Sequence, residues 1–373
     1  MSLKKILHLC EKHGFVKPLW HGSEVTRLNF GPVGEFLVNN VRQEWHYSSV
    51  VNRDENFYPV QSRLNRSDGL TNDFDGIHET YDHIKSLCNG TLPFGIAQTI
   101  ADDNLMLKNR LQAEQPHQVF KPDHQTFLRS LLFVSPNDGR QAFYTWQQKR
   151  KMWWRKFSSH PGRFSLSDIK ESGMNDKIND SSDLMVNILA EFDWGSTTIE
   201  TIRLLPLNLG DLSDKQIEIL KAKDGRKQVL PFLVECILSL EIASLVFLCD
   251  AFLENSRRQL LRLHRRLSPI KAGFVISLTD STVADRLLDV ARHLSRSLRQ
   301  NGLTTLLLSD IAKKSHDSQL ARNDEMGIPF TIVLTDSTLN DGIIWMYSRE
   351  TTLKEQVHIS KVPEYMTLLV KNY

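Results

Sequence analysis

The sequence has few of the features by which a catalytic or metal site is usually recognised. Only four of its 373 residues are cysteines, and none of them forms a Cys-x-x-Cys pair. We therefore expect reduced, buried thiols, and neither a disulfide framework nor a zinc site. The thirteen histidines show no HxxxH or HExxH spacing, and no P-loop, GxGxxG or GxSxG motif occurs. These patterns predict no metal and no cofactor, and no apolar run approaches the ~20 residues that a membrane helix needs.

The composition is that of an ordinary globular protein. Hydrophobic residues make up 40% of the chain and charged residues 24%, and the length suffices for two domains with separate cores. The formal net charge of +2 permits a nucleic-acid partner without requiring one. Residues 1–20 contain four lysines and one acidic residue, which fits either a weak mitochondrial import signal or an ordinary first helix. We favour the helix, because a typical import signal is richer in arginine and serine.

Residues 92–106, with the sequence LPFGIAQTIADDNLM, form the most informative stretch. The apolar positions of its first half predict a strand. Pro93 and Gly95 disfavour a regular central strand, and they indicate either the entry of a strand or a bulge. Because the ADDN segment that follows is acidic and turn-like, the stretch predicts a strand followed by a turn.

This stretch closely resembles the segment that leads into motif 2 of class II aminoacyl-tRNA synthetases, above all the glycyl and prolyl types. In these enzymes a Phe-Arg-x-Glu strand follows, and its arginine grips the α-phosphate of ATP. When this sequence is aligned with that strand residue by residue, Asn104 occupies the position of the arginine and Met106 the position of the glutamate. PFLVECILSLEI, at residues 231–242, similarly resembles motif 3, with Ser239 at its glycine and Ile242 at the arginine that stacks on ATP. The resemblance implies a synthetase fold with a degenerate ATP site and no catalytic residues.

The order of elements predicts an α+β fold with two domains. Residues 1–266 are expected to form a class II synthetase-like antiparallel sheet domain, and residues 267–373 an α/β domain like the anticodon-binding domain of those enzymes. In the first domain, residues 30–51 resemble motif 1, a helix and strand that build the dimer interface of that family. A polar insertion follows at residues 61–91, and residues 229–252 predict a strand that runs into a long helix. In the second domain, strands are expected at residues 274–278, 303–308, 329–335 and 342–348, with a helix at residues 283–301 and another before residue 329.

Three basic clusters are candidates for contact with a nucleic-acid backbone. The first lies in an expected helix at residues 142–157, beside Trp153 and Trp154, whose rings either pack in the core or stack on bases. The second is a DGRK turn, and the third has the i, i+4, i+7, i+8 spacing of one helix face. The members of the three clusters are Lys149, Arg150, Lys151, Arg155, Lys156, Arg226, Lys227, Arg258, Arg262, Arg265 and Arg266; all but Arg155 and Lys156 are expected to contact DNA. Each cluster by itself also fits a solvated face.

Along its whole length, the sequence resembles the accessory subunits of mitochondrial DNA polymerase gamma. FGPVGEFLVNN, LPFGIAQ, WWRKF, KDGRK, LSPIK, DEMGIPF and SRETTLKEQVHIS carry this resemblance in order and spacing. It implies a non-catalytic mitochondrial processivity factor that binds the catalytic subunit of the polymerase and strengthens its hold on duplex or primer–template DNA. Vertebrate members dimerise through a long helical hairpin, for which residues 61–91 are too short and too polar, as in the shorter insect-type subunits. We therefore expect a monomer that forms a one-to-one complex with the polymerase.

The resemblance also implies that the second domain contacts the polymerase. IIWMY, at residues 343–347, is an unbroken apolar strand, and Trp345 and Tyr347 share one of its faces. This face either anchors the polymerase or is buried by the domain's own helices. The NDG tripeptide at residues 340–342 predicts a tight hairpin turn before the strand. The residues expected at the polymerase interface are Phe330, Gly342, Ile344, Trp345, Tyr347, Leu353 and Val357.

Two other functions remain open. One is an active class II synthetase, which Asn104 and Ile242 disfavour. The other is a synthetase-like regulator that binds uncharged tRNA, which the second domain permits. Glu235 is the acidic residue retained at the ATP site, and because phosphoryl and adenylyl chemistry needs cationic clamps, we interpret it as a polar group of the core.

Overall fold

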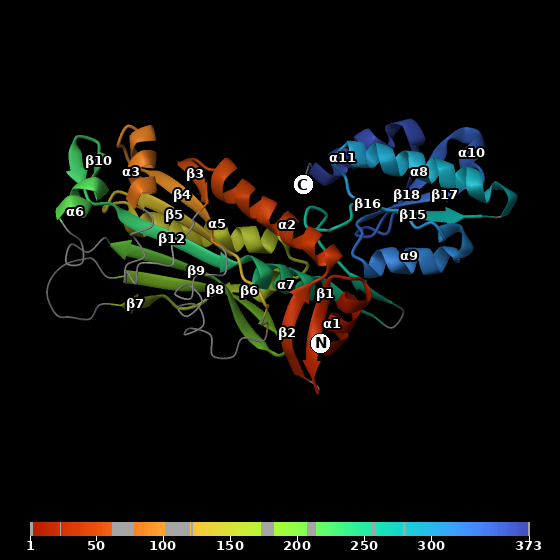
Figure 1. Ribbon diagram of the computed structural model, residues 1–373, viewed down its shortest axis with the longest axis horizontal. Helices are drawn as coiled ribbons and strands as arrows, with labels where there is room; N and C mark the ends of the chain where they lie inside the picture. Colours follow the sequence, from red (N-terminus) through yellow and green to blue (C-terminus); the bar gives the residue numbers. More distant parts are fainter. Residues whose placement is uncertain are drawn as a thin grey trace.

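The computed structural model describes residues 3–22, 24–61, 78–100, 120, 122–172, 183–206, 214–255, 258–278 and 281–371. This part of the chain contains an eight-stranded sheet before residue 240 and a five-stranded sheet after residue 271. The two sheets lie at opposite ends of the molecule, the first in orange to green and the second in blue (Figure 1). Asn104, Met106 and residues 62–77 of the expected insertion lie outside the described residues.

The larger sheet has the strand order β3-β4-β5-β12-β9-β8-β6, with β7 paired to β8. Among the described strands, β3 and β4 run parallel and the other neighbours run antiparallel, so the expected antiparallel sheet is present. Strand β4 begins directly after Pro93 and pairs without a bulge, so Pro93 marks the entry of a regular strand. The strands are β3 (Asn56–Gln61), β4 (Phe94–Ile100), β5 (Phe127–Val134), β6 (Phe164–Leu166), β7 (Lys170–Ser172), β8 (Asp183–Phe192), β9 (Gly195–Pro206) and β12 (Phe232–Ser239).

The packing of this sheet gives a steric reason for a glycine at position 95. It pairs with Phe57 on the neighbouring strand β3. A Cβ atom at residue 95 would lie 2.2 Å from the Phe57 ring, which is far inside van der Waals contact. The glycine of the LPFG segment is therefore needed for the close approach of the Phe57 side chain, not for a bulge.

One face of the larger sheet is covered by α2 (Pro32–His46), α5 (Gly139–Phe157) and α7 (Leu240–Ala251). Their apolar side chains join those of the strands in one core, and α7 is buried over its whole length. Trp153 and Trp154 of α5 belong to this core, so packing explains the two rings. The first helix, α1 (Leu3–Lys12), buries its apolar face in the same core, as expected of an ordinary first helix. It precedes a hairpin of β1 (Val16–His21) and β2 (Glu24–Phe30).

Part of the opposite face is covered by α3 (His78–Leu87) and α6 (Asp214–Leu220). Tyr81 of α3 packs against Phe94 and Phe133 of the sheet, and its hydroxyl donates a hydrogen bond to the carbonyl of Leu220. The hairpin of β10 (Ala222–Asp224) and β11 (Lys227–Val229) lies beside these helices, at the end of the molecule remote from the second sheet (Figure 1).

The smaller sheet has the order β16-β15-β17-β18-β19. Strand β15 is parallel to both of its neighbours, and the last three strands are antiparallel, so the predicted α/β alternation ends in a hairpin and an added edge strand. The apolar faces of α8 and α11 pack on this sheet in a second core. The elements are β15 (Ala272–Ser277), α8 (Ala284–Gln300), β16 (Thr305–Leu306), α9 (His316–Glu325), β17 (Phe330–Thr335), α10 (Thr338–Asp341), β18 (Ile343–Ser348), β19 (Lys354–His358) and α11 (Val362–Lys371).

Two local predictions are wrong. The helix expected to carry Arg258, Arg262, Arg265 and Arg266 on one face does not reach them. Helix α7 ends at Ala251, and the chain turns back as a hairpin of β13 (Phe252–Glu254) and β14 (Gln259–Leu261). The NDG tripeptide is likewise no two-residue hairpin turn, because Gly342 caps the short helix α10 with a φ of +68°. The positive φ expected there is present, but it ends a helix.

Candidate functional site

The positions aligned with the synthetase ATP site lie where β12 meets α7. Ser239 caps α7, because its hydroxyl accepts a hydrogen bond from the backbone N–H of Ile242 at 3.4 Å. The Ile242 side chain is buried in the core that α7 shares with the sheet. The first turn of α7 therefore presents a buried apolar group at the position where the resemblance to the synthetases implies a cation.

Glu235, the carboxylate retained in this region, is part of a buried ion pair. Its Oε1 lies 2.6 Å from Nε of Arg129 on the adjacent strand β5, and both side chains are almost completely buried. Arg129 also approaches the side-chain oxygen of Gln98 on β4. This arrangement agrees with the interpretation of Glu235 as a polar group of the core, since its charge is balanced inside the sheet.

The first basic cluster is divided by α5 into exposed and buried members. Lys149 is exposed and forms an ion pair of 3.1 Å with Asp54, while Lys151 is half-buried. Arg150 points into the core, where its Nε lies 2.6 Å from Oε1 of Glu200. Arg150 is therefore not part of an exposed basic face, because neighbouring helix positions point in different directions.

The second cluster lies at an exposed turn. Arg226 and Lys227 are both exposed between β10 and β11. Gly225, directly before them, has a φ of +60° with no atom near its open side. The predicted turn is thus confirmed, and its two cations point away from the core into solvent.

Most members of the third cluster connect distant parts of the chain. Arg258 lies 2.6 Å from Asp324 on α9, Arg265 lies 3.3 Å from Glu350, and Arg266 lies 2.8 Å from Glu44 on α2. Arg262 is exposed. These arginines therefore link the segment after α7 to helices α2 and α9 and to the turn after β18, and they do not form a free stripe.

A titratable group lies among these arginines. Burial, followed by the nearby charges of Arg265 and Lys156, lowers the pKa of His264 to about 4. The neutral ring packs edge-on against Phe157, and its Nδ1 accepts a hydrogen bond from the backbone N–H of Arg266 at 3.2 Å. Protonation would remove this acceptor and place a further cation among existing ones.

We expect acid to destabilise the protein through His264. Because its pKa is lower in the folded state, the unfolded chain binds the proton more readily, and stability is lost as the pH falls from 6.5 to about 4. At ~1.4 kcal/mol per pKa unit, this loss is at most about 3.5 kcal/mol. Urea unfolding of His264→Gln, measured across this range, should show a shallower loss than the wild type. His293→Gln, at an exposed histidine of α8, is the control; if both variants follow the wild-type curve, His264 is not the responsible group.

Some of the residues expected at the polymerase interface are buried, and others are exposed to solvent. Phe330, Ile344 and Tyr347 are buried, while Trp345 is 37% exposed and Leu353 is 61% exposed. Trp345 and Tyr347 lie on the same face of β18, where Tyr347 is buried and only Trp345 is partly exposed. Val357 is half-buried on β19, where it lines a groove with α11. The surface available to a partner is therefore smaller than the predicted set.

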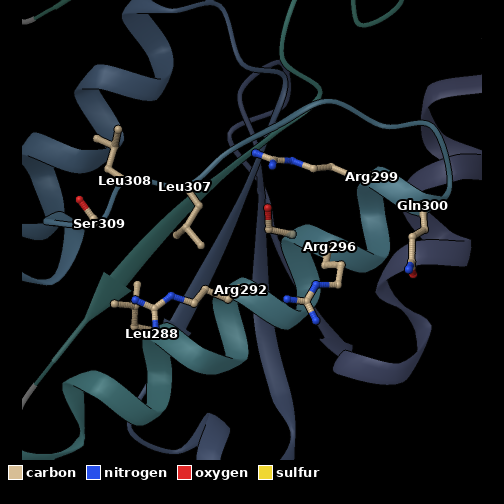
Figure 2. A pocket seen from close by; sticks show the side chains of 9 residues that line it. Leu288, Arg292, Arg296, Arg299, Gln300, Leu307, Leu308 and Ser309 are labelled. Carbon is tan, nitrogen blue, oxygen red and sulfur yellow. The ribbon is translucent and has the colours of Figure 1, made fainter.

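Sequence reasoning overlooked a further group of cations. Arg292, Arg296 and Arg299 of α8 line a cavity together with the segment that follows β16 (Figure 2). Their i, i+4, i+7 spacing could have revealed a basic face of the helix. The spacing alone does not show that residues 307–309 close the other side.

Comparisons with known proteins connect the chain to two groups. Residues 273–368 match the family of the anticodon binding domain. DNA polymerase subunit gamma-2 of Bos taurus is 30% identical over 330 residues, which cover 84% of this chain and 64% of that protein. The mitochondrial DNA polymerase subunit gamma-2 of Drosophila melanogaster is 30% identical over 246 residues, which cover 64% of this chain and 65% of that protein. A glycine–tRNA ligase of Chlorobaculum tepidum is 25% identical over 303 residues, which cover 78% of this chain and 61% of that enzyme.

The chain thus spans slightly under two thirds of the length of these curated relatives. The similarity to the bovine protein extends over 84% of this chain, and that to the ligase over 78%. Within the described residues, no helix is both long enough and apolar enough to cross a bilayer. The chain is therefore similar to the DNA polymerase subunit gamma-2 proteins and, at lower identity, to a glycine–tRNA ligase, and its residues 273–368 match the anticodon binding domain.

Proposed function

We propose that this chain is a non-catalytic processivity subunit of mitochondrial DNA polymerase gamma, acting at the nucleoid of the mitochondrial matrix. In this role it binds the catalytic subunit and strengthens its hold on primer–template DNA. The similarity to DNA polymerase subunit gamma-2 over 84% of the chain supports this assignment, as does the word mitochondrial in the name of the Drosophila relative.

The residues at the positions of the ATP site are the main support for the proposal that the chain is not catalytic. Glu235 is balanced by Arg129 at 2.6 Å inside the sheet, and Ile242 is buried where the aligned enzymes have an arginine. Adenylation needs cations that stabilise the charge developing on the phosphates, and one lost donor typically costs ~10²–10³-fold in rate. A buried isoleucine cannot supply that stabilisation, so we infer that the site is degenerate.

The exposed basic residues are the candidates for DNA contact. Lys149, Arg226, Lys227 and Arg262 are exposed, and Lys151 is half-buried. Contacts of this kind reach phosphates and add affinity without sequence preference. Arg150, Arg258, Arg265 and Arg266 are engaged in buried or bridging ion pairs instead.

We propose two domains, residues 1–266 and 267–373, of which the second docks on the polymerase through Trp345, Leu353 and Val357. The separate apolar cores on either side of residues 267–272 support this division. The short length of the 61–91 segment supports a monomer that forms a heterodimer with the catalytic subunit.

We expect the purified chain to catalyse no amino-acid-dependent pyrophosphate exchange with ATP, because Asn104 and Ile242 stand where the resemblance to the synthetases implies the two ATP-binding arginines. A bacterial glycine–tRNA ligase in the same assay is the positive control.

Added to the catalytic subunit of the polymerase, the chain should lengthen the products of primer extension at elevated salt. Measurable exchange would contradict the non-catalytic assignment, and unchanged product length would contradict the role in processivity.

A tRNA-binding regulator is the second candidate, favoured by the anticodon-binding type of domain and by the 25% identity to glycine–tRNA ligases. Filter binding of uncharged tRNA against primed DNA separates the two functions. Preferential retention of tRNA, together with no effect on the polymerase, supports the regulator.

A further inference from the structure

A cavity of about 600 Å³ lies between α8, from Leu288 onward, and the chain that follows β16 (Figure 2). Six of its lining residues come from α8, and the other three are Leu307, Leu308 and Ser309. This volume is in the range of sites for small organic ligands. We call it the α8 groove.

The polar wall of the α8 groove is strongly cationic. Arg292, Arg296 and Arg299 line it, and none of its lining residues in the described part of the chain is a carboxylate. Arg292 forms an exposed ion pair of 2.8 Å with Asp289 on the same helix. Arg296 has no hydrogen-bond or ion-pair partner in the part of the chain that the structure describes. At least one guanidinium is therefore available to an anion.

Arg299 holds the groove in shape. Its Nε donates to Oγ1 of Thr305 at 2.8 Å, and its Nη2 donates to the carbonyl of the same residue at 3.1 Å. These bonds attach the end of α8 to β16, from which the opposite wall continues. The cationic wall and the residues that face it are therefore held at a defined separation.

The remaining lining is apolar. Leu288 on α8 and Leu307 and Leu308 across from it give the groove a hydrocarbon surface beside the guanidinium groups. Guanidinium groups bind phosphate oxygens in a bidentate manner, and aliphatic side chains pack against planar rings. A ligand that matches both surfaces carries phosphate at one end and a flat, weakly polar ring at the other.

We propose that the α8 groove binds a nucleotide unit, with its phosphates against Arg292, Arg296 and Arg299 and its base against the leucines. The three arginines span seven residues of helix, or ~10 Å at 1.5 Å per residue, which accommodates more than one phosphate. The nucleotide comes either from a single nucleic-acid strand or from a free nucleoside triphosphate, since both have the same chemistry at this site.

The groove is separate from the proposed polymerase dock. It lies at the β16 edge of the smaller sheet, whereas Trp345 and Val357 lie on β18 and β19 at the other edge. None of the basic clusters predicted from the sequence contributes to it. The binding site thus goes beyond the proposed function, and it can exist whether or not the chain stimulates a polymerase.

The test compares two variants of the full chain. Arg292→Gln combined with Arg296→Gln removes two exposed cations and leaves Arg299 with its structural bonds. Arg286→Gln, at an exposed arginine of the same helix outside the groove, is the matched control. The probes are a fluorescein-labelled oligodeoxythymidine strand and a fluorescent ATP analogue, each titrated by anisotropy with the chain alone.

We expect the double variant to bind at least one probe about tenfold more weakly, as for the loss of charged hydrogen bonds, and the control to stay within about twofold. For the strand, the slope of log affinity against log salt should fall by ~1.4, at ~0.7 per lost phosphate contact. An effect on the strand alone assigns the groove to nucleic acid, and an effect on the ATP analogue assigns it to free nucleotide. Wild-type binding of both probes by the double variant overturns the proposal, as does the absence of binding by the wild type.

A competition experiment tests whether the groove recognises the base of the nucleotide as well as its phosphates. Unlabelled ATP should displace the bound probe at lower concentration than inorganic tripolyphosphate does, because only ATP contacts the leucines. Equal displacement by the two overturns the assignment to a nucleotide. Because these measurements involve no polymerase, their failure is distinguishable from a failure of the processivity assay.

Discussion

Replacing Arg150 with methionine is expected to lower the free energy of unfolding by about 3–5 kcal/mol. The carboxylate of Glu200 is buried, and it accepts hydrogen bonds from Nε of Arg150 at 2.6 Å and from Nε1 of Trp154 at 2.7 Å. Removal of the guanidinium leaves this charge in the core with one neutral donor. Urea unfolding measured at neutral pH gives the change directly.

The neighbouring lysine provides the control. Lys149→Met removes a cation from the exposed face of the same helix, and surface ion pairs of this kind contribute only ~0–1 kcal/mol. The double variant Arg150→Met/Glu200→Leu should recover much of the lost stability, since it removes both charges. If Arg150→Met keeps the wild-type stability and weakens DNA binding instead, the side chain has a binding role and the buried pair does not stabilise the fold.

The second large effect is expected at Gly342, which should be essential for docking on the polymerase. Its φ of +68° disfavours any other residue, and a Cβ atom there would lie 2.8 Å from Nε2 of His358 on β19. Gly342→Glu should therefore displace the edge of the smaller sheet and abolish the stimulation of the polymerase at elevated salt. Gly22→Glu is the matched control, because Gly22 also has a positive φ but no atom within 4 Å of the new Cβ.

The substitution Trp345→Ala tests the same proposed polymerase-binding surface without straining the backbone. Trp345 is only partly buried, so its removal should leave stability nearly unchanged, whereas a tryptophan anchor contributes about 2 kcal/mol or more to an interface. The affinity for the catalytic subunit should then fall by about thirtyfold, which surface plasmon resonance can measure. Tyr144→Ala, at an exposed aromatic residue of α5, is the control. If Gly342→Glu and Trp345→Ala both remain folded by circular dichroism and stimulate the polymerase fully, the dock lies elsewhere.

The order of the elements could be predicted because the signals behind it are local. Strand β15, helix α8 and strand β17 begin and end within a few residues of the predicted bounds, since hydrophobic periodicity and flanking glycines depend on near neighbours. The same holds for β12 followed by α7. The prediction failed just past Ala251, where arginine spacing still fits a helix. There the chain pairs β13 with β14, and the ion pair of Arg258 with Asp324 forms across 66 residues of sequence.

The sequence by itself determined the mixed α and β content, the order of most elements and the exposed DGRK turn. Only the tertiary structure decided which cations are free. Arg150 and Arg296 both lie on amphipathic helices, yet Arg150 meets the buried Glu200 and Arg296 faces an open groove. The physical reason is that the state of a charge depends on the groups and the solvent that folding brings to it, and these come from segments distant in sequence.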